Sequence, residues 1–396
     1  MTRASYSAET RSGLARDSAL LLIYIAVNAM FVYKYGVRFS GSYPVVLGLF
    51  SVMAALMIII VFGKLSWSAT EKQLSTVYGV AVGVLVIYSW LVMIEQDPET
   101  FRVGRFLSVN AWLSDLLQGK FPYGPPAHPS GFPGLYALML PFHLAGDVGL
   151  FQVFSLLVFS LLCYAQFSPR SQDVLRPIAL LACGPVFWYE VVVRSDLLGN
   201  MVLLIACVTL LGRLRRGSSG LAFLLGVSVG ILLSTRGIAF LVFAIYSGFL
   251  ARSHLPHKIF IAICALVTFL FTLLPFVLWD SARFRIYGPF AVQLSYIPSW
   301  LVLIAIVLGF LLGRRARRIE TVHAHSALLL FSLVGAVFFQ QVSDTEWSSA
   351  VFGDGFDISY FIFPVPFLLL ALRSATPVPQ NSSYPITGET HRPGTT

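Results

Sequence analysis

The chain is a nearly unbroken succession of apolar segments of membrane-spanning length, separated by short polar turns. A helix needs about 20 mostly apolar residues to cross the hydrocarbon core of a bilayer. Charged residues make up only 11% of the 396 residues, against about 25% in soluble globular chains. The sequence therefore predicts an all-α polytopic membrane protein. About twelve transmembrane helices are expected, at residues 18–36, 44–63, 74–95, 148–166, 175–192, 197–212, 219–235, 237–251, 258–279, 294–313, 324–341 and 356–372.

The longest polar interruption, residues 96–147, lies between the third and fourth expected spans and is rich in proline and aromatic residues. Long ordered loops on a rigid scaffold commonly carry function. We expect a large outward-facing loop with short amphipathic helices, including an interfacial helix from Gly134 to Ala145. Residues 1–373 then form one integral-membrane domain. Residues 374–396, rich in Pro, Ser, Thr and Gly, are predicted to be a disordered cytoplasmic tail.

Arginine clusters give the expected orientation, because short loops rich in Lys and Arg stay cytoplasmic. With twelve spans, these clusters and both termini fall on one side, and the long loop falls on the other. We therefore expect a multi-pass protein of the plasma (inner) membrane with both termini cytoplasmic. The net charge of +9 is explained by these anchors and by membrane lipids, so no nucleic acid partner is expected. The anchors are Arg3, Arg11, Arg16, Arg213, Arg215, Arg216, Arg252, Lys258, Arg314, Arg315, Arg317, Arg318 and Arg373.

Four outward turns bring carboxylates and arginines toward one membrane surface. Carboxylates can act as bases or hold a metal, and arginines clamp phosphates in a bidentate fork. Each such residue could instead be an interfacial anchor or a helix cap. Arg236 lies on an almost loopless hairpin with little water, so we expect an anionic partner for it. The candidate residues are Asp97, Glu99, Arg102, Arg105, Tyr123, Arg194, Asp196, Arg236, Arg283 and Arg285.

Several short motifs occur in a defined order along the outward side. They are NAWLSDLLQGKFPY from Asn110, PSGFPGLY from Pro129, RSDLL from Arg194, LLSTR ending at Arg236, and LPFVLWD ending at Asp280. In this order and sidedness the chain resembles the GT-C class of integral-membrane glycosyltransferases, in outline over residues 74–372. The last motif resembles the mannosyltransferase-like branch of that class.

The resemblance implies transfer of a sugar from a polyprenyl-phosphate donor to a lipid, glycan or protein acceptor, with inversion at the anomeric carbon. Arg236, helped by Arg194, Arg283 or Arg285, would neutralise the leaving phosphate, and Asp97 or Glu99 would deprotonate the acceptor. Asp196 would support an acceptor, a divalent cation or an arginine, and Tyr123 would stack on a sugar. Arg102 and Arg105 are further substrate-binding candidates. A divalent cation is the one cofactor considered. In the class, the loop carboxylate usually falls near the position of Gly104 and Arg105, whereas the nearest acids here lie upstream.

Two alternatives remain open at this point. A transporter or lipid flippase would show inverted halves and ionisable residues near the midplane of the membrane. The sequence has no persuasive internal symmetry, and its charges cluster at the outer surface. A non-catalytic membrane scaffold of the same fold is favoured by the displaced loop carboxylate.

Overall fold

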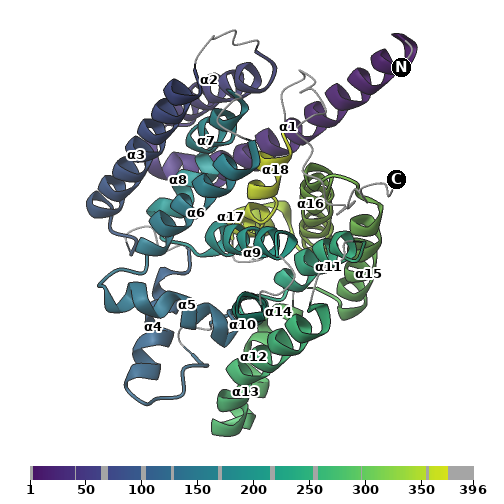
Figure 1. Ribbon diagram of the computed structural model, residues 1–396. Helices are drawn as coiled ribbons and strands as arrows, with labels where there is room; N and C mark the ends of the chain where they lie inside the picture. The colour runs from purple at the N-terminus through teal and green to yellow at the C-terminus, as the bar shows by residue number, and fades with distance from the viewer. Residues whose placement is uncertain are drawn as a thin grey trace, which may run out of the picture.

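A computed structural model describes residues 3–40, 42–63, 70–99, 104–125, 129–167, 172–214, 219–252, 257–295, 297–353 and 356–372. Every regular element in these ranges is a helix (Figure 1). Arg102 and the predicted tail at 374–396 lie outside the described residues.

Three long helices begin the chain: α1 (Arg3–Ser40), α2 (Tyr43–Phe62) and α3 (Glu71–Glu95). Proline in the first turn of α2 fixes a helical φ where its missing N–H costs nothing. At the start of α3, Thr70 and Gln73 exchange hydrogen bonds in a capping box. The helix α3 ends just before Asp97-Pro98, because a residue that precedes proline avoids the helical conformation.

The large loop after α3 contains two helices, α4 (Phe106–Leu117) and α5 (Pro133–Leu144), so the short apolar helix expected near residues 134–145 is present. Both lie in the lower half of the molecule in Figure 1, as does α13 (Ser281–Tyr287). Their aromatic side chains form a second core with α12 (Lys258–Trp279). Trp112 stacks on Tyr136 at 3.9 Å between ring centroids and also contacts Phe276 of α12. The loop is thus packed against the helix bundle.

The middle of the chain forms α6 (Leu150–Phe167), a short 3-10 turn at Gln172–Val174, α7 (Leu175–Ala182), α8 (Pro185–Val192) and α9 (Leu197–Gly212). The axes of α7 and α8 differ by 67° across Gly184-Pro185. The next helices are α10 (Ser219–Leu233) and α11 (Ile238–Leu250), joined by the hairpin that carries Arg236. The helix α9 is almost wholly buried at the centre of the bundle.

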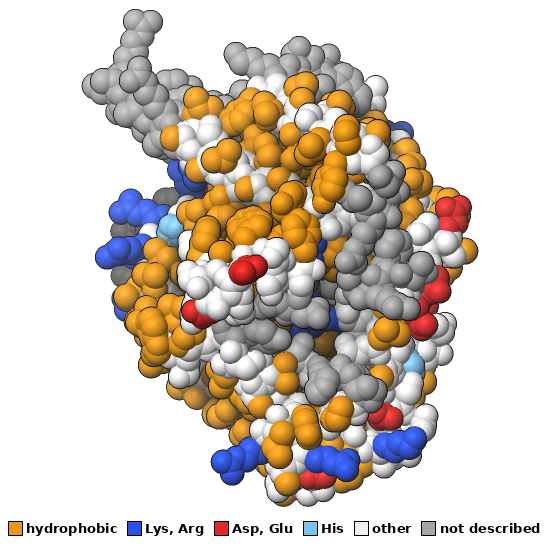
Figure 2. All heavy atoms as spheres, turned by 180° about the vertical axis from the view of Figure 1, so that it is seen from behind, with side chains coloured by type: hydrophobic (Ala, Val, Ile, Leu, Met, Phe, Trp, Pro, Cys, Tyr) orange, Lys and Arg blue, Asp and Glu red, His pale blue; other side chains and the backbone are white. Residues whose placement is uncertain are grey.

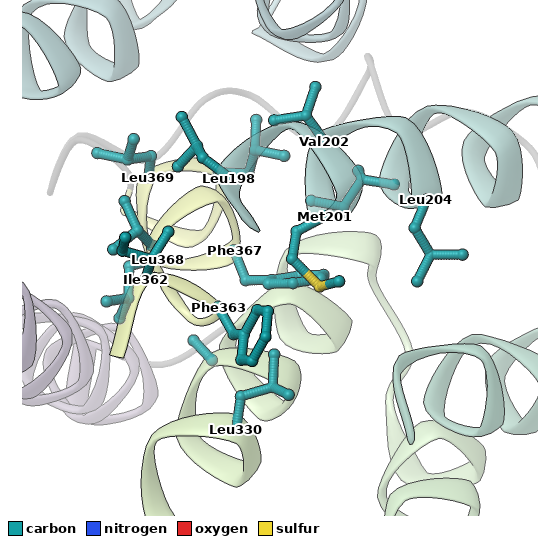
Figure 3. Packing of buried hydrophobic residues seen from close by; sticks show 14 of the residues in the cluster. Leu198, Met201, Val202, Leu204, Leu330, Ile362, Phe363, Phe367, Leu368 and Leu369 are labelled. Atoms are coloured by element: carbon teal, nitrogen blue, oxygen red, sulfur yellow. The ribbon is translucent and has the colours of Figure 1, made fainter. Parts of the chain in front are cut away.

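After α12 and α13 come α14 (Pro289–Leu294), α15 (Ser299–Arg315), α16 (Ile319–Asp344) and α17 (Trp347–Phe352). A 3-10 turn, η2 (Ile358–Ile362), and α18 (Val365–Ala371) complete the described chain. Figure 3 shows α18 and η2 packing their apolar side chains against α9, with Phe363 and Phe367 pointing toward Met201 and Leu330. Glycines allow the closest helix approaches: a Cβ on Gly313 of α15 would overlap the Ile245 carbonyl of α11.

Each predicted span coincides with a helix or a bent helix pair, but not every one has spanning length. Six described helices are long and apolar enough to cross a membrane, or up to eight if each bent pair is one span. The helices α9, α10 and α11 have only 16, 15 and 13 residues. The structure therefore confirms a polytopic helical architecture, while the count of twelve remains a prediction. Figure 2 shows apolar side chains spread over much of one face, as a lipid-facing surface requires.

Candidate functional site

The turn between α8 and α9 connects several distant parts of the chain. Arg194 in this turn has φ of +50°, a left-handed conformation that costs a non-glycine residue energy and often marks functional sites. Its Nη2 donates to the Met93 carbonyl at 2.7 Å, and its Nη1 lies 3.1 Å from an Asp147 carboxylate oxygen. Its guanidinium also covers the Phe106 ring. Arg194 thereby fastens the end of α3 and the start of α4 to the α8–α9 turn.

Asp196, two residues further on, forms a buried ion pair with Arg236 of the α10–α11 hairpin. Arg236 Nε donates to Asp196 Oδ2 at 3.0 Å, and Nη2 donates to Oδ1 and Oδ2 at 2.8 and 2.7 Å. Both residues are buried, with 1% and 3% of their surface exposed. Asn200 donates a further hydrogen bond to Asp196 at 2.6 Å. The anionic group that contacts Arg236 is therefore Asp196, in the bidentate geometry typical of strong arginine–carboxylate pairs.

The proline-rich part of the loop packs over this ion pair. The Phe132 N–H donates to the Thr235 carbonyl at 3.0 Å, beside Arg236 in the hairpin. Arg236 Nη1 points to Ser130 Oγ at 3.4 Å. Gln293 of α14 donates to the Ser130 carbonyl and accepts from the Gly237 N–H, at 2.6 and 2.7 Å. Three segments distant in sequence therefore form a polar collar around one guanidinium.

A second ion pair joins the start of the loop to the end of the chain. Arg105 Nη2 lies 2.8 Å from Asp357 Oδ2, and Nη1 donates to Ser359 Oγ at 3.0 Å. The Arg105 guanidinium also faces the Tyr360 ring, 5.1 Å from its centroid. Burial opposes ionisation of both partners, but their attraction outweighs it: the pKa of Arg105 is raised and that of Asp357 is lowered. The Asp357 side chain stays 41% exposed, so the pair is reachable from outside.

The two ion pairs form one charged layer, because η2, which follows Asp357, packs against α9, which begins directly after Asp196. Glu190 of α8 adds a carboxylate that the sequence interpretation did not select. It is fully buried, and its Oε2 accepts from the Leu198 N–H at 3.0 Å, whereas Oε1 has no hydrogen-bond partner among the described residues. An acid inside the apolar run of α8 is the signal that could have identified it. Asp357 gave no comparable signal, since its partner is 252 residues away.

The remaining described candidates form no hydrogen bond or ion pair with these residues, although the carbonyl of Gln96, next to Asp97, accepts from Arg194 Nη2 at 3.3 Å. Asp97 and Glu99 are exposed beyond the end of α3, where the Asp97 carboxylate accepts from the Glu99 N–H at 3.0 Å. Tyr123 is buried in the core of the loop, and its hydroxyl donates to the Gly131 carbonyl at 3.1 Å. Arg283 and Arg285 are exposed on α13. The structure therefore joins two of the predicted residues, Asp196 and Arg236, in one ion pair. It gives Arg105 and Arg194 their own ion-pair partners, Asp357 and Asp147.

Two apolar grooves border the charged layer. The Arg236 groove has a volume of about 160 Å³; it begins at Arg236 and Gln293 and continues along Leu241, Val302, Val334 and Tyr360 of α11, α15, α16 and η2. The aromatic groove has a volume of about 450 Å³ and lies between α1, α2, α3 and α8; Phe31, Tyr35, Met53, Tyr88, Trp188 and Tyr189 line it. The Arg236 groove thus combines an apolar lining with one cationic residue.

Within the described ranges, no group of three or more His, Cys, Asp or Glu side chains is arranged to hold a metal ion. Comparisons of the chain with protein-family models, curated proteins and solved structures found no match.

Proposed function

We propose that this protein is a membrane glycosyltransferase that moves a sugar, with mannose as the first candidate, from a polyprenyl-phosphate donor to an acceptor at the outer face of the membrane. The observation that carries this proposal is the Arg236 groove, a mostly apolar groove whose lining includes one arginine. A polyprenyl phosphate has the same two parts, a long hydrocarbon chain and an anionic head. The resemblance of the outer motifs to the GT-C class supports the same reaction.

The geometry of Arg236 suits phosphate binding even though Asp196 occupies part of it. A guanidinium has five N–H donors, and Nε and Nη2 of Arg236 face Asp196. Nη1 faces Ser130 Oγ at 3.4 Å, which is long for a hydrogen bond. A phosphate oxygen can therefore take Nη1 while Asp196 holds the guanidinium in place. On this proposal Asp196 is a positioning residue, and Arg236 contacts the substrate.

The proposed reaction is a single displacement at the anomeric carbon. The acceptor hydroxyl attacks that carbon, the bond from carbon to the phosphate oxygen breaks, and its electron pair leaves with polyprenyl phosphate. Arg236 stabilises the developing negative charge. The proton of the acceptor passes to a carboxylate, for which Asp97 and Glu99 at the end of α3 are the proposed bases.

The proposal requires the polar collar around Arg236 to lie at the outer face of the plasma (inner) membrane. Both termini are then in the cytoplasm. Twelve spans give this orientation from the arginine distribution. Cysteines introduced at Lys120 in the loop and at Arg317 between α15 and α16 should react with an impermeant maleimide from opposite sides. Labelling of both positions from one side would refute the outward location of the site.

Donor binding can be separated from folding because the ion pair can be removed as a unit. The double variant Arg236→Gln/Asp196→Asn leaves no uncompensated charge, so it should fold, yet it should lose binding of undecaprenyl phosphate in detergent. Arg236→Lys keeps the charge but loses the fork, and it should bind more weakly than wild type. The matched control Arg176→Gln/Asp173→Asn removes a partly buried ion pair at the start of α7, outside the Arg236 groove, and should bind normally. Normal binding by the Arg236 double variant would contradict the proposal. Transfer of radiolabelled sugar from polyprenyl-phosphate mannose tests the reaction itself.

A further inference from the structure

We propose that the aromatic groove binds the hydrocarbon chain of a membrane lipid that serves as the sugar acceptor. This inference rests on the proposed function and specifies its acceptor. The groove is distinct from the Arg236 groove, since it is lined by other helices and shares no residue with it. Its volume of about 450 Å³ lies within the range of small-molecule sites.

The lining of the aromatic groove favours a hydrocarbon chain over a charged or polar ligand. None of its residues is charged, and four of them are Tyr or Trp. Its wall includes Tyr88 of α3, which is 56% exposed, and neighbouring residues of α3 such as Leu91 are also exposed apolar side chains. The groove is therefore continuous with a surface that faces lipid, so a chain can enter it sideways from the bilayer.

Both grooves lie in the same half of the proposed membrane arrangement. The aromatic groove uses the second halves of α1 and α3, which approach the outer side if the N-terminus is cytoplasmic. The Arg236 groove uses the first half of α15 and the second half of α16, which approach the same side. Two lipids of one leaflet could thus reach the site together.

Arg105 connects the two grooves. Tyr360 lines the Arg236 groove, and its ring faces the Arg105 guanidinium. Tyr189 lines the aromatic groove and stacks on Tyr35 of α1 at 4.5 Å, and η2, which follows Asp357, packs against α1. The Arg105–Asp357 ion pair consequently lies between the chains of the two lipids. A head-group hydroxyl of the second lipid would meet this pair, where Asp357 is partly exposed and can accept a hydrogen bond.

The test uses a phospholipid probe, because labelling does not depend on catalysis. The purified protein is placed in phosphatidylcholine nanodiscs that contain a little phosphatidylglycerol with a photoactivatable diazirine in one acyl chain. After irradiation, mass spectrometry should find label on peptides of α1 and α8 that line the groove. Val92→Phe fills the groove from α3 and should lower this label about tenfold, because each excluded methylene changes affinity about fourfold. Val84→Phe adds the same ring at an exposed position of α3 and should leave the label unchanged.

A second variant and a second readout complete the test. Met53→Trp fills the groove from α2 and should reproduce the effect of Val92→Phe if that variant is unstable. In the transfer assay, both filling variants should lose incorporation of sugar into lipid while binding undecaprenyl phosphate normally. Equal labelling in Val92→Phe and Val84→Phe would overturn the inference, as would equal transfer to lipid by both. Failure of wild type to bind undecaprenyl phosphate would instead refute the proposed donor, so the two failures can be told apart.

Discussion

Removing one partner of the Arg236–Asp196 ion pair should destabilise the protein strongly. In Arg236→Gln, the Asp196 carboxylate keeps only the amide of Asn200 in a setting where its side chain has no exposed surface. Breaking a buried pair in this way costs about 3–5 kcal/mol, which corresponds to a factor of about 10²–10⁴ in the unfolding equilibrium. If Arg236 contacted only a bound phosphate, Arg236→Gln would instead weaken phosphate binding with little effect on folding.

The measurement is a double-mutant cycle by SDS titration of the protein in mixed micelles. Arg236→Gln and Asp196→Asn should each lower the free energy of unfolding by about 3–5 kcal/mol. The double variant should cost at least about 2 kcal/mol less than the sum of the single variants, because it leaves neither charge unpaired. Arg283→Gln removes an exposed arginine that pairs at 3.5 Å with Asp280, and it should change stability by less than about 1 kcal/mol. A coupling energy near zero, with Arg236→Gln no worse than Arg283→Gln, would refute the reasoning.

Three further predictions concern the loop and the last outward turn. Asp97→Asn or Glu99→Gln should lower the transfer rate about 10²–10⁴-fold at unchanged donor affinity, because a positioned general base has this effect; full activity of both variants would exclude these residues as bases. Gly134→Ala would place a Cβ 2.5 Å from two carbonyl oxygens of α10 and its hairpin, so it should destabilise the protein by about 1–3 kcal/mol. In the control Gly79→Ala the added Cβ meets no neighbour within 4 Å, so stability should not change. Thermal unfolding of both variants distinguishes them. The pKa of Asp357 is lowered from 3.8, so its ion pair stabilises the fold above that pH and is lost as the pH falls through the lowered value; Asp357→Asn should remove this acid-dependent loss of melting temperature.

The helical architecture could be predicted from the sequence because its cause is local. In lipid, each segment must satisfy its own backbone hydrogen bonds, so apolar runs of sufficient length must be helices. The expected spans therefore coincide with helices along the whole described chain. Whether each helix crosses the membrane cannot be read from its own sequence in the same way. The helix α9 has only 16 residues and is enclosed by other helices, so its length and hydropathy do not decide whether it spans.

The importance of Arg236 was also visible locally, since an arginine between two long apolar runs needs an anionic partner. Which anion it contacts depends on how α9 packs beside the hairpin, and no sequence pattern links Asp196 to a residue 40 positions away. The same holds for Arg105 and Asp357, which are 252 residues apart. Glu190 was visible as an acid in an apolar helix, but only its burial and its unpartnered oxygen distinguish it from an interfacial residue.

The sequence alone thus determined that the helices of this protein are suited to lipid, that the fold is all-helical, and which charged residues are costly to leave without a partner. These follow from the free energies of single side chains and single helices in lipid. The tertiary structure alone decided how Asp196 and Arg236 pair, where the loop packs, and that two apolar grooves border one charged layer. Those features depend on contacts between helices far apart in the chain. The residue pattern within one helix does not indicate which other helices it packs against.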